Sequence, residues 1–232
     1  MQTKNFGILL YRKIIKENDL FVKILSKDDK LVTGIVYGGN SSKKKNIYQI
    51  GYYLNLNLVR RNSNSPFTIN AEIDNPLLGS IINDKYKLYC LLSLISLTNL
   101  SIIEGQNIKG IFSCVDDFIN DLIVKKKWIV LYCKWLFKLL KVIGYEIDYR
   151  SNSHKKYFDV NLLKFTDIKQ KKSYLFPHDF LSEKTKIQYN YLEIIFLIFE
   201  YIYKNNHLIN YNLPDNYISF KKLILNYLSK NQ

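Results

Sequence analysis

The chain has 232 residues, of which 47% are hydrophobic and 23% are charged, a composition that excludes intrinsic disorder and leaves ample length for a buried core. Lysine and arginine number 34 against 20 acidic residues, which gives a formal net charge of +14. Such an excess favours a polyanionic partner, either nucleic acid or an acidic membrane surface. Because a chain rich in Asn, Ile, Lys and Tyr is also typical of AT-rich genomes, the positions of the lysines are more informative than their number.

In chain order, the first third contains five short segments rich in Ile, Val, Tyr and Leu, separated by charged, Gly, Asn or Ser turns. The clearest of them, YLNLNLV, alternates Leu54, Leu56 and Leu58 with asparagines, which puts the leucines on one face of a strand. The fourth is read as one strand over NIYQIGYYLNLNLV. Five strands within residues 1–74 predict an OB-fold barrel, with an SH3-like barrel as the alternative.

From residue 75 to residue 147 the apolar spacing becomes helical and predicts the first part of a helical domain. The segment KYKLYCLLSLISLTNL is apolar almost all round and is expected to be a buried helix. A second helix is expected from about Ile111, and a third that ends near Gly144. On the third helix, apolar residues recur at helical spacing and predict a core face: Trp128, Leu131, Trp135, Leu139 and Val142. Lysines form a separate row on the same helix: Lys127, Lys134, Lys138 and Lys141.

The segment from 148 to 185 is polar and irregular, and it is predicted to be an appendage in which KYFDV and SYLFP form short extended pieces. Residues 186–232 return to helical spacing and complete the helical domain. KTKIQYNYLEIIFLIFEYIYKN predicts a long buried helix, and DNYISFKKLILNYLSK a last one that Asp215 is placed to cap. The expected class is therefore α+β.

No residue pattern in the chain points to catalysis. His154, His178 and His207 are scattered, and motifs such as GxSxG, HExxH, a P-loop or GxGxxG are absent from the sequence. The carboxylate pairs at 28–29 and 116–117 are read as a turn and as early-helix charges. We therefore expect a protein that is not an enzyme and that binds no cofactor.

The cysteines and the apolar runs indicate the compartment. Cys90, Cys114 and Cys133 stand far apart without a CxxC pair, which predicts free buried thiols and neither a zinc site nor disulfides. The first residues lack the apolar core of a signal peptide, and the longest charge-free run, residues 88–103, is short for a membrane span. These features predict a cytoplasmic protein.

The stretch VTGIVYGGNSSKKKN is the strongest candidate for a binding site. Its glycine pair permits a tight turn, and Lys43, Lys44 and Lys45 follow in the loop after the third strand. Arg60 and Arg61 end the fourth strand. Loops of a Greek-key barrel flank the face along which nucleic acid runs. Tyr52, with its neighbours Tyr48 and Tyr53, offers stacking surfaces. The competing interpretation is a solvated hairpin end with core tyrosines.

The residues from 7 to 43 also resemble the N-terminal domain of the RecO family of recombination mediators. That family has an opening G-I-V-L strand, an E-x-D turn, two further strands and a KGarrskS loop. Matching segments occur here in the same order, at residues 7–10, 17–19, 20–25 and 30–36. Gly38 matches the glycine of the loop, but Tyr37 replaces the lysine before it, so the charge moves to Lys43, Lys44 and Lys45.

Further along, WLFKLLKVIGYEIDY resembles the family's felrLLxllGyxpdl, with Gly144 and Tyr145 as the anchor. Many members place a four-cysteine zinc site directly after this element. Because this chain has no cysteine after Cys133, it resembles a zinc-free branch in which the appendage takes the place of the zinc ribbon.

The resemblance implies a non-enzymatic, nucleoid-associated protein that binds single- and double-stranded DNA and anneals complementary strands. It further implies action on DNA coated by the single-stranded DNA-binding protein SSB, and loading of the RecA recombinase together with RecR. The acidic SSB tail ends in an apolar residue and requires an apolar pocket edged by cations. Five residues of the third helix are candidates for this pocket: Lys134, Trp135, Lys138, Leu139 and Lys141.

Two other functions remain open from the sequence. One is an OB-fold RNA- or ribosome-binding factor whose helices dock a protein. The other is a structural adaptor whose positive charge is compositional.

Overall fold

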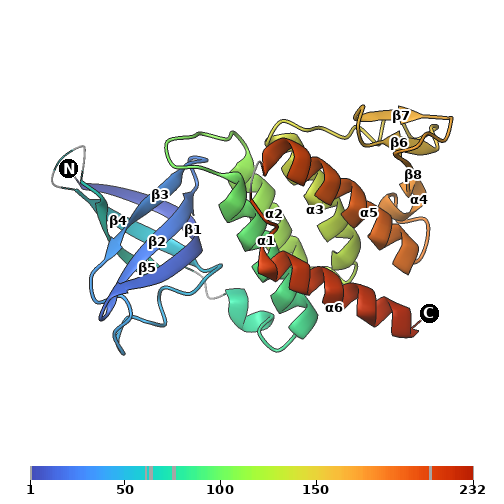
Figure 1. Cartoon of the computed structure of the whole chain (residues 1–232). Coiled ribbons are helices and arrows are strands. Elements are labelled where there is room, and N and C mark those ends of the chain that lie inside the picture. The colour runs from blue at the N-terminus through green and yellow to red at the C-terminus, as the bar shows by residue number, and fades with distance from the viewer. Residues whose placement is uncertain (1, 61, 63–64, 75–76, 209–210, 232) are drawn as a thin grey trace. The chain divides into compact units, whose positions relative to one another are not determined.

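The computed structural model describes residues 2–60, 62, 65–74, 77–208 and 211–231. The chain divides into two compact units, Met1–Asp116 and Asp117–Gln232. The first contains a β-barrel and a helix, and the second contains helices with a small sheet (Figure 1). Among the described helices, none has both the length and the apolar content that a membrane crossing requires.

Five strands form a closed barrel in the order β1-β2-β3-β5-β4, drawn in blue to cyan in Figure 1. All neighbouring strands are antiparallel except β3 and β5, which run parallel. This arrangement confirms the predicted OB-fold barrel followed by helices. The strands are β1 Gln2–Lys16, β2 Asp19–Ser26, β3 Leu31–Val36, β4 Tyr53–Val59 and β5 Phe67–Ile73.

The alternation that predicted the strands also explains the barrel core. Along β4, Leu54, Leu56 and Leu58 are buried inside the barrel, together with inward residues of the other strands. The predicted fourth strand was too long, however. Residues 46–52 form turns, and the strand itself covers only Tyr53–Val59.

Tyr48 is the physical reason for this difference. Its ring is buried in the barrel core, and its hydroxyl oxygen accepts the backbone N–H of Ala71 at 3.1 Å. The carbonyl oxygen of Tyr48 in turn accepts a hydrogen bond from Nη1 of Arg12 at 2.9 Å. Burial raises the pKa of Tyr48, although the bond from Ala71 opposes this. The loop after β3 therefore packs into the barrel and cannot pair as a strand.

A helix completes the first unit. The 3₁₀ turn η1 Leu77–Ser80 precedes α1 Lys85–Ser101, which contacts β1. Asp84 caps α1, since one of its carboxylate oxygens accepts the N–H groups of Tyr86 and Lys87 at 3.0 and 3.1 Å. The predicted buried helix is confirmed.

Asp29 connects the barrel to the start of α2 Ile111–Val124 within the first unit. Its two carboxylate oxygens accept the N–H groups of Gly110 and Phe112 at 2.7 and 2.9 Å. Asp29 therefore satisfies donors that a helix N-terminus leaves unpaired. The sequence placed this residue in a turn, which is correct, but it gave no sign of the capping role because the two segments are 81 or more residues apart.

We expect Asp29→Ala to lower the free energy of unfolding by about 1–2 kcal/mol, since it removes the acceptor for both N–H groups. Urea unfolding measures this. The neighbouring carboxylate supplies a matched control: Asp28 is exposed, and its hydrogen bond within the described part of the chain is a long one from Asn5 at 3.4 Å. Asp28→Ala should therefore change stability by less than about 0.5 kcal/mol. Equal losses in the two variants would contradict the capping role.

The second unit is built around three helices: α3 Trp128–Val142, α5 Tyr189–Ile202 and α6 Asp215–Asn231. α5 contacts both α3 and α6, and the ring of Tyr132 on α3 packs against Phe196 and Phe220. The predicted long helix is shorter than expected. Residues 184–188 are mostly exposed and precede α5, which ends in the π-helical turn η2 Tyr203–His207.

The predicted appendage contains a three-stranded sheet in the order β7-β6-β8, formed by β7 Lys164–Thr166, β6 Tyr157–Asp159 and β8 Ser173–Leu175. The short helix α4 His178–Leu181 follows. Rings of Phe158, Phe165, Phe176 and His178 pack together beside the sheet. β7 was missed because a three-residue strand with one buried side chain has no readable alternation.

Candidate nucleic-acid interface

The loop between β3 and β4 holds the three lysines in a compact turn. Gly38 has a positive φ of 64° and open space beside it, a conformation that favours glycine. Its N–H donates to the carboxylate of Asp19 at 2.8 Å, and its carbonyl oxygen accepts the hydroxyl of Ser41 at 2.7 Å. The backbone N–H groups of Lys44 and Lys45 then donate to the Ser41 carbonyl. The loop therefore has a defined shape.

The lysine side chains of this loop differ in their surroundings. Lys43 and Lys45 are exposed. Lys44 is half-buried, and its ammonium group donates to the carbonyl oxygen of Tyr37 at 3.4 Å. Two of the three lysines are therefore exposed to solvent, as phosphate contact requires.

The other predicted residues are placed less favourably. The guanidinium group of Arg60 lies over the ring of Phe67, 4.8 Å from its centroid, and Arg61 lies outside the described residues. Tyr52 is half-buried against the barrel core. Its neighbours Tyr48 and Tyr53 are buried, and Tyr53 donates its hydroxyl hydrogen to Asp116 at 2.6 Å. Tyr48 and Tyr53 are therefore core residues and offer no stacking surface.

The structure shows a different aromatic surface, on the outer face of β1 and β2. Because Leu20, Val22 and Ile24 point into the barrel, the residues between them point outward. Register pairs Tyr11 with Lys23, and Lys13 with Phe21, and the ammonium of Lys23 lies 5.7 Å from the centroid of the Tyr11 ring. We call these four residues, Tyr11, Lys13, Phe21 and Lys23, the outer barrel face.

This face was recognisable in principle. Successive side chains of a strand point to opposite faces, so once Leu20, Val22 and Ile24 are assigned to the core, Phe21 and Lys23 must lie outside. OB-folds bind oligonucleotides on the face of strands 2 and 3, and Phe21 and Lys23 lie on the second strand. Aromatic rings stack on bases, while lysines neutralise phosphates without reading sequence. Together with the lysine loop, the outer barrel face has the chemistry of a nucleic-acid interface.

The predicted SSB-tail residues on α3 do not form an open pocket. Trp135 is 2% exposed and Leu139 is 0% exposed. Each lysine of the row has an acidic neighbour: Lys134 pairs with Glu183 at 2.8 Å, Lys138 with Asp117 at 2.7 Å and Lys141 with Glu146 at 2.5 Å. The bond from Lys134 lowers the pKa of Glu183. The docking role of these residues stays a prediction.

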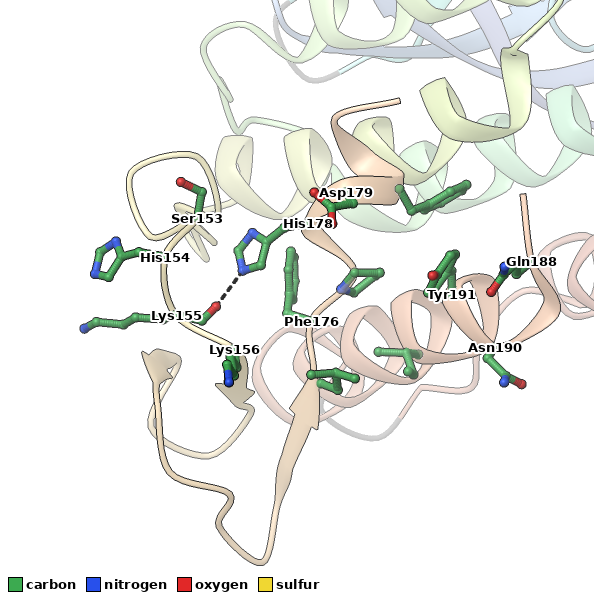
Figure 2. Close-up of a pocket in the computed structure, with 14 residues that line it drawn as sticks. Ser153, His154, Lys155, Lys156, Phe176, His178, Asp179, Gln188, Asn190 and Tyr191 are labelled. Carbon is green, nitrogen blue, oxygen red and sulfur yellow. Dashed lines mark hydrogen bonds between the residues drawn. The ribbon is translucent and has the colours of Figure 1, made fainter. Parts of the chain in front are cut away.

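A cavity of about 480 Å³ lies in the second unit, beside the appendage. Figure 2 shows Phe176, His178 and Tyr191 around it, while the side chains of His154 and Lys155 extend away from Phe176. Nε2 of His178 lies 2.9 Å from the carbonyl oxygen of Lys155. Within the described part of the chain, no three His, Cys, Asp or Glu residues are grouped so that they could hold a metal ion.

Comparison of this chain with known proteins identifies relatives that share one protein name. No family model matches the chain. Proteins named DNA repair protein RecO match at 28% identity: over 148 residues in Rickettsia canadensis (strain McKiel), 149 in Rickettsia bellii (strain OSU 85-389) and 148 in Rickettsia africae (strain ESF-5). These matches cover 64% of this chain and 61–62% of the relatives, less than two thirds of their own length. The similarity and the barrel-then-helix order confirm the predicted resemblance, and the chain is consistent with a member of the RecO family.

Proposed function

We propose that this protein acts in recombinational DNA repair as a DNA-binding protein that is not an enzyme. The observation that carries the proposal is the similarity to proteins named DNA repair protein RecO. It is supported by an OB-fold barrel that presents Lys43 and Lys45 on one loop, and by the aromatic and basic residues of the outer barrel face.

The finer activity that we propose is strand annealing. Two DNA strands repel each other, so a protein that anneals them has to neutralise phosphate on both strands and leave the base edges free for pairing. A net charge of +14 and lysines on a shaped loop suit this task, since lysines act as mobile point charges. We further propose that the protein acts on SSB-coated DNA and, with RecR, promotes RecA loading.

A competition experiment tests this function. Labelled SSB-coated single-stranded DNA is offered with unlabelled structured RNA as competitor, and annealing of complementary oligonucleotides is followed by fluorescence quenching. We expect retention on the DNA, faster annealing, and capture of SSB and RecR in a pull-down. Preference for structured RNA without annealing would replace the proposal with the RNA- or ribosome-binding alternative. Failure to bind either nucleic acid would leave the structural adaptor.

A further inference from the structure

The tip of the β1–β2 hairpin, residues 13–19, carries large apolar side chains that are exposed to solvent. Ile14 is 54% exposed and Ile15 is 43% exposed, and Tyr37, at the start of the lysine loop, is 57% exposed. Single exposed apolar residues are ordinary. We call Ile14 and Ile15, adjacent in the chain at the hairpin end, the apolar patch, and Tyr37 begins the loop that bonds to the same hairpin.

The hairpin tip and the lysine loop form one connected surface. Ile14 pairs with Leu20, and Leu20 pairs with Val36 of β3, directly before Tyr37. Two hydrogen bonds of 2.8 Å fasten the loop to the hairpin turn, from Gly38 N–H to the Asp19 carboxylate and from Asn40 N–H to the carbonyl oxygen of Asn18. These bonds hold the lysine loop in a fixed position relative to the hairpin tip.

A β-bulge contributes to the exposure of the isoleucines. The register shifts between Ile14 and Lys16, so that Ile15 has no opposite residue on β2. Bulges bend a strand and re-aim the side chain at the bulged position. The exposed side chain of Ile15 is therefore the one at the bulged position of the hairpin.

Exposed lysines lie on the same hairpin and on the loop that is bonded to it. Lys13 and Lys16 on the hairpin are exposed, as are Lys43 and Lys45 on the loop. Of the nearby acids, Glu17 is exposed, whereas Asp19 already accepts the N–H of Gly38. Phosphate binding alone would need only the cations. Apolar side chains between cations suit a nucleic acid whose base faces are uncovered, because isoleucine can press against an unstacked base step.

Resting on the proposed DNA-binding function, we propose that the hairpin tip recognises the junction at which a DNA duplex opens into single strands. Ile14 and Ile15 lie against the terminal base pair, where stacking is interrupted, while Lys43 and Lys45 contact the flanking phosphates. A continuous duplex offers no uncovered base face to the isoleucines, so it gains only the phosphate contacts. The surface therefore distinguishes a forked DNA from a covalently closed duplex circle, which has no ends.

The test compares the full chain with the double variant Ile14→Thr, Ile15→Thr, since threonine keeps the branched shape and strand preference but is polar. Affinities are measured by fluorescence anisotropy for a labelled forked duplex, and by competition for a covalently closed duplex circle without ends, with 2-aminopurine at the fork junction to report unstacking. We expect the wild type to prefer the fork by roughly tenfold, a factor within the range of one base–side-chain contact, and to raise the 2-aminopurine signal. The double variant should lose both effects and bind the closed duplex circle unchanged.

A matched control replaces two exposed isoleucines elsewhere, Ile103→Thr and Ile168→Thr, which are 67% and 74% exposed, and should keep the fork preference. Equal wild-type affinity for the two duplexes, or a preference that survives in the Ile14, Ile15 variant, overturns the junction proposal and leaves DNA binding intact. If that variant instead keeps its fork preference but loses binding to anionic vesicles or to a partner protein, the isoleucines bind the membrane surface or that protein and not DNA. Absence of any DNA binding by the wild type overturns the proposed function as well.

Discussion

Replacing Lys43, Lys44 and Lys45 with alanine is expected to weaken DNA binding for all sequences alike and to flatten its dependence on salt. Each phosphate contact that is lost lowers the slope of log affinity against log salt by about 0.7–0.9. Lys43 and Lys45 are exposed, whereas Lys44 donates to the Tyr37 carbonyl. The triple variant should therefore lose two to three phosphate contacts, and the slope should fall by about 1.4–2.7. Anisotropy titrations at several salt concentrations measure it.

The chain offers a matched control in a second run of three lysines, Lys125, Lys126 and Lys127. All three are exposed, and two form surface ion pairs, Lys125 with Asp121 at 2.8 Å and Lys127 with Glu183 at 3.4 Å. Their replacement by alanine removes the same charge from the second unit, and surface pairs contribute little to stability. If both triple variants reduce the slope equally, binding follows net charge, and the lysine loop has no special role.

The second large effect is expected at Tyr48, which anchors the lysine loop in the barrel. Tyr48→Ala should lower the free energy of unfolding by about 3–5 kcal/mol, the usual cost of removing a buried aromatic ring. Tyr48→Phe keeps the ring but leaves the N–H of Ala71 without its 3.1 Å acceptor, and should cost about 1–3 kcal/mol. Urea unfolding of the full chain, followed by far-ultraviolet circular dichroism, measures both losses.

The phenylalanine variant also separates anchoring from DNA contact. If Tyr48 acts only through the barrel core, Tyr48→Phe should bind DNA with nearly the wild-type salt slope under conditions in which it remains folded. A stability loss below about 1 kcal/mol for Tyr48→Ala would show that the ring does not fill the barrel core as the structure indicates. A reduced salt slope in a fully folded Tyr48→Phe variant would instead assign this residue to the DNA surface.

The sequence by itself determined that five strands come first and that the main helices follow, and approximately where they lie. Period-two alternation such as Leu54, Leu56 and Leu58 has only one way to bury its leucines, and helical spacing around Trp135 and Leu139 likewise allows only one kind of element. These patterns depend on neighbouring residues in the chain, so they can be read locally. The lysine loop was also located correctly between the third and fourth strands.

Only the tertiary structure decided which residues of that region are available to a ligand. Tyr48 and Tyr53 look like stacking surfaces in the sequence, yet burial and hydrogen bonds to residues 23 and 63 positions away make them core residues. Asp29 caps a helix 81 residues further along the chain. The closure of a barrel and the pairing of distant polar groups depend on contacts between segments far apart in sequence, and no local pattern records them.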